Sequence, residues 1–401
     1  MSCRTESIEN RRTSLQAQLD AHKSQAERNR LGQFATPTQL ARDVVAYGLT
    51  LLSKSAPLRF FDPAIGTGSF YSALKVVSND RSVQSASGFE IDAHYGDPAK
   101  ALWEGSPLKI TVADFTRQTA PPVDEERATL LICNPPYVRH HHIARDEKTR
   151  LHAAARESAH VELSGLAGLY CYFIALAHGW MREGSIAGWL IPSEFMDVNY
   201  GRALKAYLLR EVTLLHIHRF DPNDVQFDDA LVSSAVVWIK NVRPPANHRV
   251  QFSYGGTMQQ PAAHKSVIVS DLERTNKWTR FPKHDAEAEH NGYRLGDLFT
   301  IKRGLATGDN RFFILDEDKV CSLNLPHRFL RPILPSTRHI KVDEINSDAA
   351  GLPLLDKRLF LLDCDRPESE IARDEPALWS YLQSGIEHVA PRYLCRTRRF
   401  W

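Results

Sequence analysis

The chain has 401 residues, of which 43% are hydrophobic and 24% are charged, and its formal net charge is +2. These values are typical of a globular protein with two domains, or with one large and one smaller domain. The small net charge excludes a uniformly basic nucleic-acid-binding protein, so any surface for nucleic acid must be local. No apolar run is long enough to span a membrane, and residues 1–30 lack the apolar core of a signal peptide.

The cysteines and histidines do not form a recognisable metal-binding pattern. The six cysteines are scattered, with no CxxC pair, which favours free thiols in a reducing cytoplasm over a disulfide framework or a zinc site. The adjacent residues His140, His141 and His142 cannot all point at one metal ion, and no other ligand lies at a suitable spacing. We therefore expect a cytoplasmic protein without a metal, and a polar loop at 140–142 that can contact backbone phosphates.

The N-terminal segment predicts a helical extension over residues 1–30. Residues 5–30 contain no glycine or proline and are rich in Glu, Gln, Arg and Ala. The apolar positions are few, Ile8, Leu15 and Leu19, so the helix should lie over another surface. Two interpretations remain open: a solvated lid, or a helix that contacts DNA or a partner.

A second helix is marked by its starting residues. Thr36 before Pro37 is typical of an N-cap followed by proline at the first helical position, and an apolar helical pattern runs over residues 39–52. Alone, this pattern predicts only where a helix begins.

Residues 58–115 alternate between strand-like and helix-like segments. The expected elements are strands at 58–61, 85–91 and 108–112, a glycine loop at 62–70 that opens a helix, and a further helix at 94–104. Because strands and helices alternate, this part of the chain predicts a doubly wound α/β sheet that binds a nucleotide-like ligand at the ends of its strands.

Polar residues follow each of these strands. The glycine loop contains Gly66 and Gly68 but no third glycine and no GK[ST], so it is neither a dinucleotide fingerprint nor a P-loop. Asp62 would repel a phosphate and suits a cationic or zwitterionic ligand. Glu90 is placed to accept ribose hydroxyls, and Asp114 could take an adenine amino group. S-adenosylmethionine fits these three acids better than NAD does.

The apolar run 128–132 predicts a buried strand that must end at Cys133-Asn134-Pro135-Pro136-Tyr137, because two prolines cannot continue a ladder. The strand end then presents an amide, backbone carbonyls and an aromatic ring. That combination can hold a flat ring that bears an amine. We expect Cys133 itself to pack inside the strand end.

The remaining pattern predicts three more strands and three more helices. The strands are expected at 185–192, 212–220 and 231–240, the helices at 145–158, 168–181 and 202–210, and a polar loop at 221–229 contains Phe227. The fold class is therefore a doubly wound α/β sheet of seven strands with an antiparallel seventh strand. The pattern breaks at Arg243-Pro244-Pro245, which predicts a boundary between a domain at 31–242 and a mixed α+β domain at 243–401. Two interpretations of the aromatic C-terminal end stay open: an incomplete domain, or a packed terminus.

These motifs resemble those of the gamma-class N6-adenine DNA methyltransferases of type II restriction–modification systems, which include the TaqI-like and BsuBI/PstI-like modification methylases. Phe34-Ala35-Thr36-Pro37 is similar to motif X, Asp62 to Gly68 to motif I, Glu90 and Asp114 to the acids of motifs II and III, and Asn134-Pro135-Pro136-Tyr137 to motif IV. Weaker similarities are Leu169-Tyr170 to motif V, Val225-Gln226-Phe227 to motif VIII, and Gly304 to Gly308 to a segment of the target-recognition domain.

The resemblance implies a methyl transfer from S-adenosylmethionine to a flipped adenine in double-stranded DNA with a short recognition site, which protects the DNA from a cognate restriction enzyme. It implies Asn134, Pro135 and Tyr137 as catalytic residues, and Tyr137 and Phe227 as stacking partners of the base. The cofactor-binding residues that it implies are Thr36, Pro37, Asp62, Ala64, Gly66, Gly68, Glu90, Asp114 and Phe115.

Two other functions use similar features. A methyltransferase of RNA bases or of a protein glutamine can carry the same Asn-Pro-Pro-Tyr, but such enzymes usually lack the segment around Thr36 and a separate C-terminal recognition domain. A non-catalytic DNA-binding subunit is the alternative of another class, and the intact Asn134 and Tyr137 argue against it. An Asn134 side chain turned away from the cofactor pocket would favour that alternative.

Overall fold

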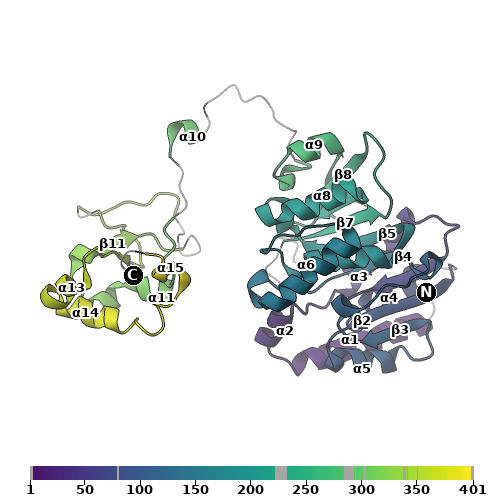
Figure 1. Cartoon of the computed structure of the whole chain (residues 1–401), viewed down its shortest axis with the longest axis horizontal. Coiled ribbons are helices and arrows are strands. Elements are labelled where there is room, and N and C mark those ends of the chain that lie inside the picture. The colour runs from purple at the N-terminus through teal and green to yellow at the C-terminus, as the bar shows by residue number, and fades with distance from the viewer. Residues whose placement is uncertain are drawn as a thin grey trace. The chain divides into compact units, whose positions relative to one another are not determined.

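The computed structural model describes residues 3–78, 81–221, 233–283, 293, 295–300, 304–336, 340, 342–349 and 351–398. The chain forms two compact units, which we call unit 1 (Met1–Glu289) and unit 2 (His290–Trp401) (Figure 1). Each unit is described by itself. In the described part of the chain, no helix is long and apolar enough to cross a membrane.

Unit 1 is built on a nine-stranded sheet with the order β3-β2-β1-β4-β5-β7-β6-β8-β9. The strands are β1 (Leu58–Asp62), β2 (Val83–Glu90), β3 (Leu108–Val112), β4 (Ala128–Cys133), β5 (Met181–Pro192), β6 (Thr213–Arg219), β7 (Ser234–Lys240), β8 (Arg249–Gly256) and β9 (Pro261–Ile268). Strands β3, β2, β1, β4 and β5 are parallel neighbours, and β7 lies antiparallel between β5 and β6. The doubly wound sheet with an antiparallel seventh strand is thus confirmed, and two further strands extend it.

The two extra strands change where unit 1 ends. β8 pairs in parallel with β6, and β9 pairs antiparallel with β8. The expected boundary at residue 243 therefore falls inside unit 1, which runs to Glu289. Arg243-Pro244-Pro245 lies in the connection between β7 and β8, and the buried residues Val250 and Phe252 of β8 then return the chain to the sheet.

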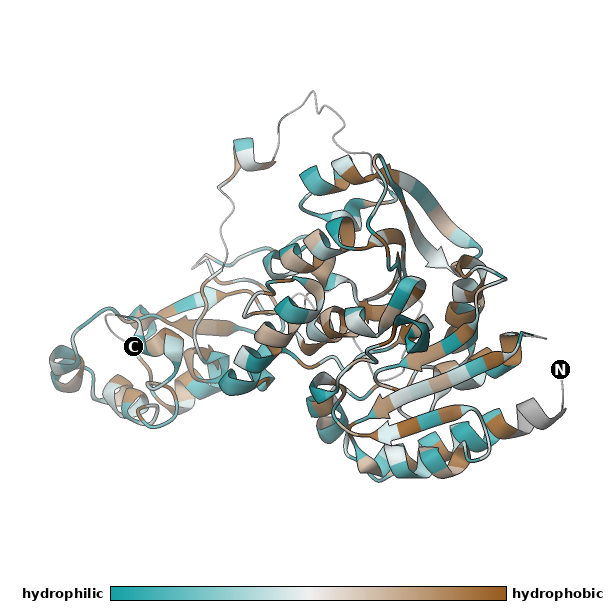
Figure 2. Cartoon of the chain, turned by 45° about the vertical axis from the view of Figure 1, so that its right-hand side comes forward, coloured by the Kyte–Doolittle hydropathy of each residue, from teal (hydrophilic) through white to brown (hydrophobic). Residues whose placement is uncertain are grey.

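Helices cover both faces of the sheet because its strands bury alternate side chains on opposite sides. Phe61, Leu131 and Val237 pack with α6 (Arg145–Ala159), α7 (Leu169–Ala177) and α8 (Arg202–Arg210), whereas Phe60, Leu130 and Trp238 pack with α3 (Thr38–Leu51) and α4 (Ser69–Val77). The remaining helices of unit 1 are α1 (Cys3–Ala21), α2 (Gln25–Leu31), α5 (Ala93–Leu102) and α9 (Val269–Arg274). Helices of the chain show both hydrophilic and hydrophobic segments, as expected for elements with one buried face (Figure 2).

One predicted helix start is wrong. Helix α3 begins at Thr38 and its N-cap is Pro37, without a side-chain cap. Thr36 lies one residue earlier, and its hydroxyl group contacts another part of the chain, described below. The local pattern located the helix but assigned the wrong role to Thr36, because a tertiary partner competes for the hydroxyl group.

Unit 2 contains a small three-stranded sheet of order β10-β12-β11 with antiparallel pairing. Its elements are β10 (Ile314–Asp316), β11 (Leu330–Ile333), β12 (Leu359–Leu362), α10 (Leu295–Leu298), α11 (Asn310–Phe313), α12 (Glu317–Ser322), α13 (Glu368–Asp374), α14 (Pro376–Gln383) and α15 (Tyr393–Arg396). Phe312 and Tyr381 stack within the core, with ring centroids 4.7 Å apart and an interplanar angle of 9°. Unit 2 therefore has a mixed α+β core of its own.

Candidate active site

A cavity of about 520 Å³ lies in unit 1 at the ends of four neighbouring strands. Its lining includes Gly66 after β1, Glu90 at the end of β2, Asp114 after β3 and Asn134 after β4. Between β1 and β4 the strand order reverses, which is the position where doubly wound sheets bind their ligands. The volume lies within the usual range of small-molecule sites, about 300–1,000 Å³.

The structure brings many of the expected site residues to this cavity. Ala64, Gly66, Glu90, Asp114, Phe115 and Asn134 line it. Among the described residues, the expected site residues that do not line it are Thr36, Pro37, Asp62, Gly68, Pro135 and Tyr137. Phe227 lies outside the described residues. Two of the residues outside the lining, Thr36 and Asp62, hydrogen-bond to residues that line the cavity.

The two glycines of the glycine loop have different structural roles. Gly66 (φ 54°) borders the cavity, and a Cβ atom there would meet nothing within 4 Å, so its backbone is open to a ligand. Gly68 (φ 90°) precedes α4, and a Cβ atom there would lie 2.6 Å from Nε1 of Trp103. Trp103 in turn donates from Nε1 to the carbonyl oxygen of Thr67 at 2.9 Å. Gly68 therefore allows the loop to pack on Trp103.

Asp62 shapes the loop from inside the protein. Its side chain is buried, with 2% of its surface exposed. The carboxylate accepts the N–H of Ala64 at 3.0 Å and the thiol of Cys133, and burial raises the pKa of Asp62 to about 7. Asp62 does not line the cavity and its carboxylate has these internal donors, so its contact with a cationic ligand stays a prediction.

Glu90 and Asp114 end adjacent strands and both border the cavity. The carboxylate of Glu90 accepts the N–H of Gly66 at 3.1 Å and the N–H of Asp92 at 2.9 Å, while burial raises its pKa to about 7. The carboxylate of Asp114 accepts the N–H and the hydroxyl of Thr116 at 2.9 and 2.7 Å. Glu90 thus ties the glycine loop to the end of β2 while its side chain borders the ligand space.

The side-chain amide of Asn134 is oriented by the segment that precedes α3. Its Nδ2 donates to the carbonyl oxygen of Phe34 at 3.1 Å and to the hydroxyl of Thr36 at 3.2 Å. A carbonyl oxygen can only accept, so the NH₂ group must face Phe34, and the oxygen Oδ1 is on the other side of the amide. Asn134 lines the cavity rather than turning away from it, which favours a catalytic chain over a non-catalytic subunit.

Close backbone packing fixes the position of the Asn-Pro-Pro-Tyr segment. Gly32 has φ 65°, and a Cβ atom there would lie 2.3 Å from the backbone nitrogen of Tyr137. The hydroxyl of Tyr137 donates to the carbonyl oxygen of Leu190 at 3.0 Å, and its ring lies 5.8 Å from that of Phe34. Residues 32–36 therefore form a support for the end of β4.

Several lining residues were not expected from the sequence. They come from the N-terminal helix, the segment before α3, the helices α5 to α7 and the loop before α6: Gln16, Asp20, Gln33, Phe34, Tyr95, His142, Glu147 and Phe173 are among them. Gln16 and Asp20 share one face of α1 because they are four residues apart. That spacing is common on any polar helix, so it carries no signal for a site until the docking of α1 is known.

The sheet order, the glycine loop and the acids at the strand ends are those of the class I S-adenosylmethionine-dependent methyltransferase fold, whose cofactor is S-adenosylmethionine. Among solved structures, a class I S-adenosylmethionine-dependent methyltransferase from Listeria monocytogenes shares this fold with a TM-score of 0.50 and 18% identity over 64% of this chain and 75% of that chain. The type IIG restriction endonuclease BpuSI shares it with a TM-score of 0.51 and 15% identity over 88% of this chain and 45% of that chain.

Two family models match separate parts of the chain. The model of the Eco57I restriction-modification methylase matches residues 100–226, and that of the type II methyltransferase M.Eco57I C-terminal domain matches residues 283–401. The chain is 24% identical to the type II methyltransferase M.AccI of Acinetobacter calcoaceticus and 26% identical to M.XamI of Xanthomonas campestris pv. amaranthicola, in each case over 93% of this chain and 69% of the relative. The resemblance to type II restriction–modification methyltransferases is thereby confirmed.

Proposed function

We propose that this chain is a site-specific DNA methyltransferase that transfers a methyl group from S-adenosylmethionine to the N6 amino group of adenine. The observation that carries this proposal is the orientation of Asn134. Its NH₂ group is held by Phe34 and Thr36, so Oδ1 is the acceptor that remains for a substrate amine beside the cofactor cavity. The matches to type II methyltransferases support DNA as the substrate.

The lining of the cavity suits each part of S-adenosylmethionine. The carboxylate of Glu90 can accept ribose hydroxyls, and that of Asp114 can accept the adenine amino group. Phe89 and Phe115 provide apolar surface for the adenine ring. Burial keeps the pKa of Glu90 high, so donors from a ligand would stabilise its ionised form. When bound, the cofactor supplies a methyl group on a sulfonium centre.

The chemistry requires an amino group whose lone pair is available. In adenine this lone pair is delocalised into the ring, and two acceptors on the two N–H bonds favour a tetrahedral nitrogen. Asn134 Oδ1 and the carbonyl oxygen of Pro135 are suited to this role, and the two prolines fix the backbone that carries them. The main contribution of the protein is orientation, and a dedicated general base is not required because the product ammonium is acidic.

The target base must leave the duplex to reach Asn134, at a cost of a few kcal/mol. We propose that the ring of Tyr137 stacks on one face of the flipped adenine and Phe227 on the other. Each stacking contact contributes about 1–3 kcal/mol, which offsets much of this cost. The bond from the Tyr137 hydroxyl to Leu190 and the contact with Phe34 hold this ring in one orientation.

We propose that unit 2 reads a short recognition site in double-stranded DNA, and that a cognate restriction endonuclease in the same cytoplasm is the functional partner. Its loop 304–310 is held by arginines of the C-terminal segment. Arg392 donates to the carbonyl oxygen of Gly308 at 3.2 Å and pairs with Asp309 at 2.9 Å, and Arg398 donates to the carbonyl oxygen of Ala306 at 2.5 Å. The side chain of Leu305 is 71% exposed beside these bonds. A braced loop with an exposed side chain suits contact with a DNA groove.

The test is base-modification sequencing of DNA from cells that express the full chain, followed by mass spectrometry of its nucleosides. N6-methyladenine at one short motif, absent with the Asn134→Ala variant, is the expected result. The variant should still bind the cofactor. Methylated cytosine, methylated RNA or a methylated glutamine side chain in place of N6-methyladenine would refute the adenine assignment. Full methylation by the variant would refute the role of Asn134.

A further inference from the structure

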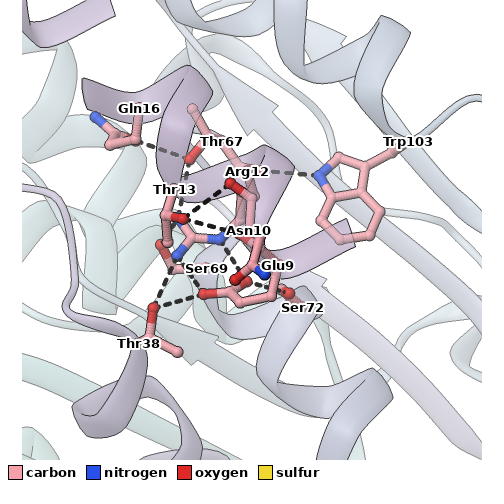
Figure 3. A network of polar contacts seen from close by, with 10 residues as sticks. All are labelled: Glu9, Asn10, Arg12, Thr13, Gln16, Thr38, Thr67, Ser69, Ser72 and Trp103. Atoms are coloured by element: carbon pink, nitrogen blue, oxygen red, sulfur yellow. Dashed lines mark hydrogen bonds and ion pairs between the residues drawn. The ribbon is translucent and has the colours of Figure 1, made fainter. Parts of the chain in front are cut away.

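Helix α1 carries a buried ion pair whose two residues both contact other elements of unit 1 (Figure 3). Nε and Nη2 of Arg12 donate to the two carboxylate oxygens of Glu9 at 2.8 and 2.7 Å. The exposed fractions of the two residues are 2% for Arg12 and 6% for Glu9. A pair so deeply buried is costly unless further hydrogen bonds satisfy both partners.

Those hydrogen bonds come from α3, α4 and the glycine loop. Nη1 of Arg12 donates to the hydroxyls of Thr67 at 3.2 Å and Ser69 at 2.9 Å, while Thr38 and Ser72 donate to the Glu9 carboxylate. Burial raises the pKa of Glu9, but the hydrogen bonds from Arg12, Ser72 and Thr38 outweigh burial, and the net pKa lies below its usual value. Glu9 is therefore ionised, and the charged pair joins α1 to the loop that carries Gly66.

The next two turns of the same face reach the cavity. The hydroxyl of Thr67 donates to Oε1 of Gln16 at 2.7 Å, and Nε2 of Gln16 donates to Oδ1 of Asp20 at 3.0 Å. The hydroxyl of Tyr95 also donates to Asp20, at 2.8 Å. Gln16, Asp20 and Tyr95 line the cavity together with Gly66 and Glu90. Arg12, Gln16 and Asp20 thus form one continuous face at intervals of four residues.

The contact face of α1 combines apolar and polar side chains. Leu19 is buried and Ile8 and Leu15 are partly buried, while Glu9 and Arg12 are buried on the same helix. A helix that only covered a core would present an apolar stripe. Polar groups placed beside the glycine loop instead match the ribose and the amino acid part of the cofactor, which carry hydroxyl, ammonium and carboxylate groups.

We propose that α1 is a wall of the S-adenosylmethionine site, with Gln16 and Asp20 as cofactor-contacting residues and the Glu9–Arg12 pair as the contact that positions them. Cofactor binding and docking of α1 are then coupled through Thr67, which contacts both Arg12 and Gln16. The inference rests on the cofactor site alone and does not depend on which base or polymer receives the methyl group.

The test measures S-adenosylmethionine binding to the full-length chain by calorimetry without DNA. Gln16→Ala, Asp20→Asn and Arg12→Ala should each raise the Kd about tenfold or more. Arg11→Ala is the matched control, because Arg11 is the adjacent arginine on the exposed face of α1, and its Kd should stay within about twofold of the parent. Hydrogen exchange of residues 9–20 should slow on cofactor addition in the parent chain.

Hydrogen exchange of residues 9–20 also shows whether α1 has detached in the Arg12→Ala variant, so that an unchanged Kd for this variant can be interpreted. An unchanged Kd in a variant whose α1 exchanges rapidly would overturn the proposal, since the site would then be complete without the helix. Unchanged Kd values for both Gln16→Ala and Asp20→Asn would also overturn it. A parent chain that binds S-adenosylmethionine but transfers no methyl group to DNA would contradict the function proposed above and leave this inference intact.

Discussion

The amide nitrogen of Asn134 lies 3.1 Å from the carbonyl oxygen of Phe34, a residue 100 positions earlier in the chain. This contact joins the end of β4 to the segment that precedes α3. It determines which side of the amide donates and which side accepts, so the direction of the proposed catalytic acceptor depends on a residue outside the Asn-Pro-Pro-Tyr motif. The first two predictions follow from it.

Replacing Thr36 should impair methyl transfer without loss of cofactor. Thr36→Val removes one of the two acceptors of the Asn134 amide, and a hydrogen bond contributes about 0.5–1.5 kcal/mol, or roughly two- to twelvefold in rate. We expect kcat to fall by that factor while the Kd for S-adenosylmethionine is unchanged. Thr36→Ser keeps the hydroxyl group and is the control. Equal kcat values for the two variants would show that this bond does not orient Asn134.

Gly32→Ala should damage the active site through the backbone. The added Cβ would lie 2.3 Å from the nitrogen of Tyr137, and φ of 65° is unfavourable for alanine, so the Asn-Pro-Pro-Tyr segment must shift. We expect methyl transfer to fall at least a hundredfold. Gly165→Ala is the control, because a Cβ there meets nothing within 4 Å. Activity of Gly32→Ala close to that of Gly165→Ala would contradict this close packing.

Removal of either proposed stacking ring should weaken the complex with a flipped base. Tyr137→Ala and Phe227→Ala each lose a contact of about 1–3 kcal/mol, which corresponds to roughly five- to 150-fold in affinity. The measurement is the fluorescence of 2-aminopurine placed at the target position. Tyr137→Phe retains the ring and should bind nearly as well as the parent. A titration that is unaffected by Phe227→Ala would remove Phe227 from the base site.

Cofactor affinity should depend on pH through Glu90. Burial raises the pKa of Glu90 to about 7, and the ionised carboxylate is the form that accepts both ribose hydroxyls. Below pH 7 the group is protonated in the free protein, so the affinity for S-adenosylmethionine should fall as the pH decreases from 8 to 6. Calorimetry across this range should show a flat profile for Glu90→Gln. A parent profile that is equally flat would refute the assignment.

Much of the site could be predicted because its residues follow strands that are recognisable on their own. Glu90, Asp114 and Asn134 each come at or just after the end of a predicted strand, and parallel strands bring their ends to one edge of the sheet. What could not be predicted depends on tertiary contacts. From the sequence, Asp62 was expected to contact the ligand, whereas in the structure Ala64 and Cys133 donate hydrogen bonds to its buried carboxylate.

The docking of the N-terminal helix and the end of unit 1 also depend on tertiary contacts that the local sequence does not reveal. The polar pattern of residues 5–30 predicted a helix over some surface, but the docking of Arg12 on Thr67 and Ser69 is not visible in local sequence. The prolines at 244–245 marked a real break in the chain, yet a break between strands of one sheet and a break between units look alike in sequence. Only the pairing of β8 with β6 separates the two cases.

The two edge strands of the sheet in unit 1 carry residues that disfavour pairing with strands of other chains. In the described part of the protein, β3 and β9 each have one neighbour in this sheet. β3 carries the exposed Lys109, and β9 begins with Pro261 and carries Lys265. Lysine and proline oppose the addition of a foreign strand to an open edge. The strands added beyond the expected seven therefore leave the sheet protected from edge-to-edge aggregation.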